Sequence, residues 1–246
     1  MHLNPSAKAI PMNAEALLSL LQFSDGLFPV GSYAHSFGLE TYVADGSIRD
    51  AQGVQSFVLS YLQGSAAPTD AVAVLASRRA ALAHKATRFE QCARIDKLLD
   101  ATKTASELRD ASRQMGRQLL RIAVNLSGPS LDGLTPSLFQ AVEANETPGH
   151  HPMAFGVVGA ALVWGETEMI RAYLYSTCAG AIAASLRLLP LGQLAGQRIL
   201  WALLPQIATL AEEVQSRDIK DIWSFASGIE IASMRHANLD ARLFRS

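Results

Sequence analysis

Residues 53–64 read GVQSFVLSYLQG, and their apolar side chains recur with the period of an α-helix. The apolar positions are Val54, Phe57, Val58, Tyr61 and Leu62, which together line one helix face. Similar helical patterns follow along the chain, and no sustained apolar/polar alternation bounded by turn residues interrupts them. The sequence therefore predicts an all-α fold, a single-domain helical bundle of about eight to ten helices.

Turn and capping residues suggest where these helices begin and end. Thr69-Asp70 predicts the N-cap of a helix running to about Ala83, and the last helix is expected to begin near Asp218. Two helices rich in Ala and Gly, about 152–164 and 167–187, are expected to form either the core of the bundle or the core of a dimer. We expect a flexible leader at 1–13, one all-α domain at 14–234 and a C-terminal partner-binding tail at 235–246.

Composition narrows the class of protein. The chain has 246 residues, 49% hydrophobic and 17% charged, which excludes an intrinsically disordered chain. The net charge of -1 gives no reason to expect nucleic acid or an anionic membrane as a partner. The longest charge-free stretch, 147–165, has too short an apolar part to span a bilayer. Two distant cysteines, Cys92 and Cys178, and an N-terminus unlike a signal peptide favour a cytoplasmic protein.

Motifs for catalysis are missing from the sequence. It contains neither a GxSxG nucleophile elbow nor a Gly-rich phosphate loop, so we predict no catalytic residues and no cofactor. We predict no metal site: the adjacent His150 and His151 are expected to cap or pack a helix, with weak metal binding as the alternative. Arginines recur every four residues along one helix face, which predicts either a solvated face or a docking face for an acidic partner. They are Arg109, Arg113, Arg117 and Arg121.

Three segments are more particular than packing requires. Residues 28–40 read FPVGSYAHSFGLE, residues 185–200 read SLRLLPLGQLAGQRIL, and residues 234–246 read MRHANLDARLFRS. The last segment places two arginines around a Leu-Phe pair that looks exposed, and these are residue types found at interface hot spots. We expect this tail to become ordered when it meets a partner.

Together with 106–117 and 150–156, these segments resemble the UreF family of urease accessory proteins, in the expected order from about residue 16 onward. The resemblance implies an all-α homodimer without enzymatic activity. Members of the family bridge a UreD/UreH-type protein and the GTPase UreG, and the assembly delivers nickel to apo-urease.

The resemblance also assigns roles to residues. It implies contact with the UreD/UreH-type partner for six residues at the end of the chain: His236, Arg242, Leu243, Phe244, Arg245 and Ser246. It implies a structural or partner-binding role for the other motif residues: Pro29, Gly31, Ser32, Tyr33, Ser36, Gly38, Glu40, Arg187, Pro190, Gly192, Gln193, Gly196 and Gln197.

Arg171 and Tyr175 are four residues apart on an apolar helix, and we predict that they lie at the dimer interface. The alternative is an intramolecular cation–π pair.

Three hypotheses about function follow. In the first, the chain is a scaffold that gates GTP hydrolysis and nickel insertion. In the second, it activates the GTPase by donating an arginine finger, Arg242 or Arg245. In the third, it is a helical enzyme or metal carrier that uses His150 and His151.

Overall fold

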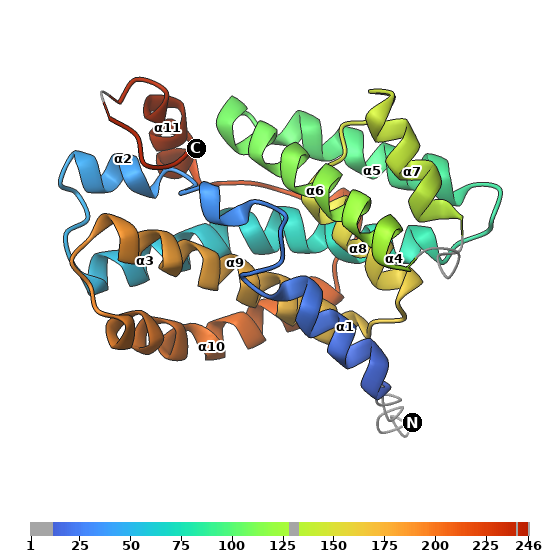
Figure 1. Ribbon diagram of the computed structural model, residues 1–246, viewed down its shortest axis with the longest axis horizontal. Helices are drawn as coiled ribbons and strands as arrows, with labels where there is room; N and C mark the ends of the chain where they lie inside the picture. The colour runs from blue at the N-terminus through green and yellow to red at the C-terminus, as the bar shows by residue number, and fades with distance from the viewer. Residues whose placement is uncertain (1–11, 128–132, 240, 246) are drawn as a thin grey trace, which may run out of the picture.

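The computed structural model describes residues 12–127, 133–239 and 241–245, and helices form all the regular structure within these ranges (Figure 1). In chain order the elements are α1 (Ala14–Ser24), η1 (Ser32–Ala34), α2 (Leu39–Ala44), α3 (Ala51–Tyr61), η2 (Leu62–Ala71), α4 (Val72–Ala81), α5 (Arg88–Thr102), α6 (Ser106–Ser127), α7 (Leu134–Glu143), α8 (His151–Ala161), α9 (Glu166–Leu188), α10 (Gln193–Gln215), η4 (Ile219–Asp221) and α11 (Ser227–His236). The all-α prediction is confirmed. Within these ranges, no helix is both long and apolar enough to cross a bilayer.

The elements α3, η2 and α4 follow one another without a break and form a rod through the middle of the molecule (Figure 1). Val54, Phe57, Val58 and Tyr61 are buried on one face of α3, as their spacing predicts. The α4 part of the rod packs chiefly on α8, while α9 and α10 pack on each other. The contact between α4 and α8 joins helices that lie far apart in the sequence, whereas α9 and α10 are consecutive helices.

Of the two helices rich in Ala and Gly, α8 is buried over most of its length, whereas α9 has both buried and exposed residues. Every residue of α8 from Pro152 to Gly159 is buried, so this helix belongs to the core of a single chain. Gly156 of α8 lies directly against the Val74 carbonyl oxygen, and a Cβ atom there would overlap that oxygen. The absence of a side chain is what lets α8 and α4 approach this closely.

The prediction that Thr69-Asp70 caps a new helix is wrong. Both residues are buried inside η2, a π-helical stretch that also contains Pro68. Proline has no N–H to donate, and the wider π-turn accommodates it within a continuous helix. Instead of capping, the Thr69 hydroxyl donates to the Trp223 carbonyl oxygen at 2.6 Å.

The extended residues 222–226, called the strap below, explain why the rod does not break. The Phe225 N–H donates to the Gly64 carbonyl oxygen at 2.8 Å, and the Trp223 N–H donates to that of Pro68 at 3.4 Å. The last helix therefore begins at Ser227, after the strap, and not near Asp218 as expected. Asp218 instead caps the short turn η4.

Candidate partner-binding site

The predicted C-terminal tail covers residues 235–246, of which 235 and 236 belong to α11. Residues 241–245, which alone are called the tail below, lie against the N-terminal motif. The C-terminal end of the chain is drawn beside α2 and α11 in Figure 1. The Leu243 N–H donates to Oε1 of Glu40 at 2.6 Å, and the Phe244 N–H donates to Oε2 of Glu40 at 3.1 Å. The Arg245 N–H donates to the Ala34 carbonyl oxygen at 2.8 Å. The first and third motif segments of the sequence thus form one site.

Glu40 is the centre of this site. Its buried carboxyl group also lies 2.7 Å from Nε2 of the fully buried His236. A carboxylate can only accept hydrogen bonds, so Nε2 of His236 is the donor when Glu40 is ionised. Burying a charge is costly unless it is hydrogen-bonded, and here the donors come from α11 and the tail. Glu40 therefore holds together three segments that are distant in sequence.

Arg187 of α9 joins the second motif segment to the same site. Its Nη1 donates to the Tyr33 carbonyl oxygen at 2.9 Å. Its guanidinium carbon lies 4.3 Å from the centre of the Phe244 ring and 5.9 Å from that of Tyr33. Contacts of this kind are cation–π interactions. Arg187 thus anchors the aromatic side chain of the tail.

The two apolar residues of the tail differ in exposure. The sequence suggested that both are exposed, but the Phe244 side chain is buried. Leu243 is 53% exposed, and both Arg242 and Arg245 are exposed. Ser246 lies outside the described residues. The partner-binding role of these residues remains a prediction.

The remaining N-terminal motif residues shape the turn that carries η1. Gly31 and Gly38 have φ angles of +88° and +86°, which favour glycine. A Cβ atom on Gly38 would also lie 3.0 Å from the Ile229 carbonyl oxygen of α11. The buried Ser36 hydroxyl oxygen accepts from the Glu40 N–H at 3.4 Å, whereas Pro29 is exposed.

The 190–197 part of the second segment forms the turn between α9 and α10. Gly192 is the N-cap of α10, and Gly196 packs against Leu186 and Ile182 of α9. Pro190, Gln193 and Gln197 are exposed. The glycines therefore have structural roles, and the exposed residues remain candidates for contact with a partner.

Arg171 and Tyr175 are both exposed on α9. Nη2 of Arg171 lies 3.5 Å from Oε1 of Glu212 on α10. Among the described residues, the cation–π contacts of the structure involve Arg187 and not Arg171. The role of Arg171 and Tyr175 in a dimer remains a prediction.

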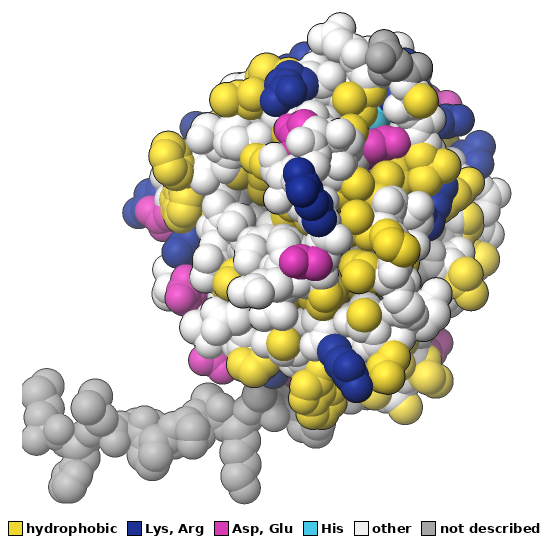
Figure 2. All heavy atoms as spheres, turned by 90° about the vertical axis from the view of Figure 1, so that its left-hand side faces the viewer, with side chains coloured by type: hydrophobic (Ala, Val, Ile, Leu, Met, Phe, Trp, Pro, Cys, Tyr) yellow, Lys and Arg dark blue, Asp and Glu magenta, His cyan; other side chains and the backbone are white. Residues whose placement is uncertain are grey.

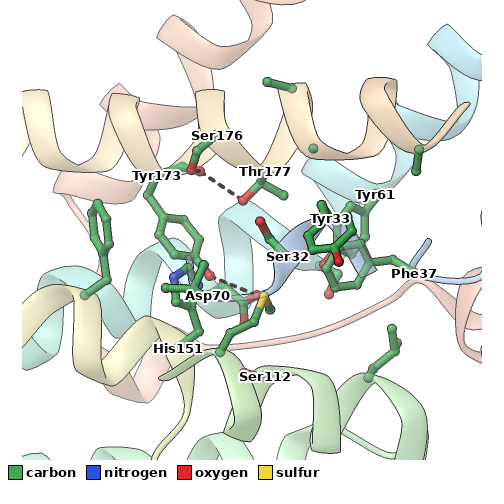
Figure 3. A pocket seen from close by; sticks show the side chains of 18 of the residues that line it. Ser32, Tyr33, Phe37, Tyr61, Asp70, Ser112, His151, Tyr173, Ser176 and Thr177 are labelled. Atoms are coloured by element: carbon green, nitrogen blue, oxygen red, sulfur yellow. Dashed lines mark hydrogen bonds between the residues drawn. The ribbon is translucent and has the colours of Figure 1, made fainter. Parts of the chain in front are cut away.

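A cavity of about 600 Å³ lies next to the tail site, between α9, α6 and the turn that carries η1 (Figure 3). Ser32, Tyr33 and Phe37 line one side of it, and Tyr173, Ser176 and Thr177 line another. Its lining combines aromatic and aliphatic side chains with serine and threonine hydroxyls and several charged groups. Clefts of this size with a few convergent polar groups are typical of binding sites.

A buried ion pair lies at the cavity. Nζ of Lys103 lies 2.7 Å from Oδ1 of Asp70, and the Tyr173 hydroxyl donates to Oδ2 of Asp70 at 3.4 Å. Burial, together with the nearby charge of Asp70, raises the pKa of the Tyr173 hydroxyl well above its usual value. Burial and, to a smaller extent, the Lys103 charge lower the pKa of His151 to about 4, so its ring is neutral. No motif in the sequence indicated that Asp70, Lys103 and Tyr173 lie together.

His150 lies outside the cavity in a hydrogen-bonded network. Its Nδ1 is 3.1 Å from Oγ of Ser112, and its Nε2 is 3.0 Å from Oδ1 of Asp100. This order of groups resembles that of serine hydrolases. However, Ser112 lies inside α6, where backbone N–H groups are committed to the helix and cannot form an oxyanion hole. We interpret the network as a structural link between α5, α6 and α8.

The structure favours a packing role for the two histidines. The His151 ring lies 5.4 Å from that of Tyr173 and 6.0 Å from that of Phe155, between centres. His150 occupies the N-cap position of α8, but its side chain does not cap the helix. Within the described ranges, no three or more His, Cys, Asp or Glu side chains are grouped so as to hold a metal ion.

The arginine row on α6 is partly neutralised. Arg109 donates to the Lys103 carbonyl oxygen at 3.0 Å, Arg113 pairs with Asp100, and Arg117 lies 3.6 Å from Glu143. Each of these contacts lies within the chain, which favours a solvated, ion-paired face.

Comparisons with known proteins place the chain in a family. The sequence profile of the UreF family matches residues 48–204. The urease accessory protein UreF of Arthrobacter sp. (strain FB24) is 32% identical over 232 residues, covering 93% of this chain and 96% of that protein. The urease accessory protein UreF of Paenarthrobacter aurescens (strain TC1) is 31% identical over 237 residues, covering 96% of this chain and 100% of that protein. The chain therefore belongs to the UreF family of urease accessory proteins.

Proposed function

We propose that this chain is a non-enzymatic scaffold for urease activation. It bridges a UreD/UreH-type protein and the GTPase UreG, so that GTP hydrolysis and nickel insertion into apo-urease follow correct assembly. Its similarity to urease accessory proteins supports a role in urease maturation. Cys92 and Cys178 are buried and form no disulfide bond, which is compatible with the cytoplasmic location that we propose.

The observation that carries this proposal is the contrast between buried anchors and exposed apolar residues at the end of the chain. Phe244 and His236 are buried, whereas Ile231, Met234 and Leu243 are exposed on α11 and the tail. Figure 2 shows the end of the molecule that carries α2 and α11, and hydrophobic side chains gather on it in several clusters. An ordered surface with apolar residues beside arginines is typical of a protein interface.

The test is co-expression of this chain with the UreD-type protein of the same organism, followed by size exclusion with light scattering. Leu243→Asp and Ile231→Asp place charges on exposed positions, so the fold should survive and the complex should be lost. The matched control is Leu82→Asp, an exposed leucine at the end of α4, which should leave the complex intact.

Two results would count against the proposal. If the Leu243→Asp variant binds as well as the unsubstituted chain, the tail is not the contact. If urease activation by UreG proceeds equally well without this chain, the scaffold role itself fails.

The arginine-finger alternative is tested in the same system. If it holds, Arg242→Ala or Arg245→Ala should lower stimulated GTP hydrolysis on the order of 10³-fold in single-turnover assays, while the complex still forms. A scaffold predicts hydrolysis that depends on assembly and not on either guanidinium group.

A further inference from the structure

The turn that carries η1 has two faces, and each belongs to a different site. Residues 31–37, called the wall segment below, line the cavity through Ser32, Tyr33 and Phe37. On its other side, Ala34 accepts a hydrogen bond from the tail residue Arg245. The tail site and the cavity therefore share a wall that is only one chain segment thick.

Arg187 makes this connection direct. It stacks on Phe244 of the tail, donates to the Tyr33 carbonyl oxygen and also lines the cavity. Tyr33 is 72% exposed although it lines the cavity, which places it at the mouth. Phe37, at the end of the wall segment, stacks on Tyr61 with ring centres 5.6 Å apart.

The backbone of the wall segment is suited to moving as a unit. Gly31 at its start and Gly38 just after its end both have left-handed φ angles, and Phe37 has a φ of +52°. A phenylalanine in this region is strained and is kept there by its surroundings. Segments bounded by such residues often act as hinges, because a few φ and ψ changes there move the residues between them.

We infer that docking of the tail holds the wall segment in place and thereby controls access to the cavity. Glu40 and Arg187 are positioning residues in this device, because they act on the cavity only through the wall segment. A partner that engages α11 and the tail would then change the cavity without touching it. Two distinct sites whose states depend on one shared element are what allosteric coupling requires.

Thiol labelling of the chain alone can test this coupling. Ala184 of α9 lines the cavity and is buried, so Ala184→Cys introduces a thiol there with little change in size. The native Cys92 and Cys178 are fully buried, and burial raises the pKa of the Cys178 thiol to about 12. Both are therefore slow internal references for a methanethiosulfonate reagent.

Two tail-site variants and one control are compared in the Ala184→Cys background. Phe244→Ala removes the ring on Arg187, and Glu40→Gln replaces an acceptor with an NH₂ group that faces N–H donors. We expect Phe244→Ala to speed labelling at position 184 about tenfold, the factor that corresponds to losing about 1.4 kcal/mol of cation–π contact. Glu40→Gln should speed it as well, because it weakens the hydrogen bonds that hold the tail. Leu82→Ala is the control, because it shortens an exposed side chain just after α4, away from the tail, and should leave the rate unchanged.

Equal labelling rates in all variants would overturn the inference. A rise that Cys92 shares to the same extent would also overturn it, because that result means general loosening. Hydrogen exchange of residues 31–37 in single Phe244→Ala and Glu40→Gln variants gives a second measurement without a cysteine in the cavity. Relative to the unsubstituted chain, each variant is expected to show a larger increase in exchange at residues 31–37 than in α8. An exchange rate at residues 31–37 that does not change would contradict the coupling.

The effect of the partner on the cavity rests on the proposed function, and a separate labelling experiment tests it. Adding the UreD-type protein should change the labelling rate at position 184. If the tail variants change the rate but the partner does not, the coupling stands and the proposed tail contact fails. If the partner binds and neither it nor the variants change the rate, the coupling fails and the proposed contact stands.

Discussion

His150 illustrates how a buried polar side chain makes stability depend on pH. Burial lowers its pKa to about 4, the Lys103 charge adds to this, and the hydrogen bond to Asp100 opposes it. His35 behaves alike, because burial and the nearby Arg245 charge lower its pKa to about 4. The unfolded chain therefore binds protons more readily than the folded chain below the unperturbed value of 6.5.

The expected result is a loss of stability as pH falls from about 6.5 towards 4, by about 1 kcal/mol per pH unit for each such histidine. Urea unfolding at several pH values measures it. His150→Asn should lower stability at neutral pH but give a shallower pH profile. His84→Gln, at an exposed histidine, should keep the original profile. If the stability of His150→Asn and that of the unsubstituted chain depended on pH equally steeply, His150 would not be a source of the pH dependence.

The sequence identified single residues of the tail site but not their geometry. Glu40, Arg187 and His236 were selected by their motifs, yet nothing in the sequence showed that Glu40 accepts from both α11 and the tail. The cavity residues Asp70, Lys103 and Tyr173 were missed because they are distant in the sequence: they come from η2, from the residue that follows α5, and from α9. One signal was available: Asp70 is the only charged residue in the apolar run 66–77, and such a residue needs a buried partner.

At the scale of helices, close contact between α6 and α8 depends on Gly116. A Cβ atom there would overlap the backbone of Gly149 and His150 at the start of α8. We expect Gly116→Ala to destabilise the chain by about 2–3 kcal/mol, because backbone cannot yield as a flexible side chain does. Thermal or chemical unfolding measures this.

Gly180 of α9 is the matched control. A Cβ atom on it would meet nothing within 4 Å, so Gly180→Ala should stabilise the helix by about 0.5–1 kcal/mol. If both substitutions had the same effect, the close approach at Gly116 would not matter for stability.

Helix periodicity predicted most helices, but it failed at η2 and the strap. A Thr-Asp pair after proline is a good local signal for a helix start. It was overridden because strap N–H groups pair with the Gly64 and Pro68 carbonyl oxygens. Gly64 also lacks a Cβ atom that would lie 2.7 Å from the Phe225 carbonyl oxygen. These contacts join residues that are far apart in the sequence, so no local pattern could reveal them.

At the scale of the whole molecule, the exposed part of α9 bears on oligomeric state. Tyr175 is exposed on α9, and Leu194 and Trp201 are exposed on α10, which packs against it. Exposed aromatic side chains on packed helices are frequent hot spots of interfaces. They support the proposal of a homodimer.

If Tyr175 is part of that interface, Tyr175→Asp should weaken dimerisation by about 2 kcal/mol, a factor of about thirty in the dissociation constant. Sedimentation velocity over a range of concentrations measures it. Leu82→Asp, at an exposed leucine on α4, should leave dimerisation unchanged. A Tyr175→Asp dimer of undiminished strength would place the interface elsewhere.

The buried carboxylate of Glu40 has a consequence for how the chain is made. Its three hydrogen-bond donors lie 196, 203 and 204 residues further along the chain. During synthesis, the N-terminal motif therefore leaves the ribosome long before any of its partners exist. The helices of the body can form from local contacts, whereas Glu40 must wait until residue 244 has been released. Closure of this site is thus among the last folding steps, and a nascent chain cannot present a finished partner surface before translation has passed that point.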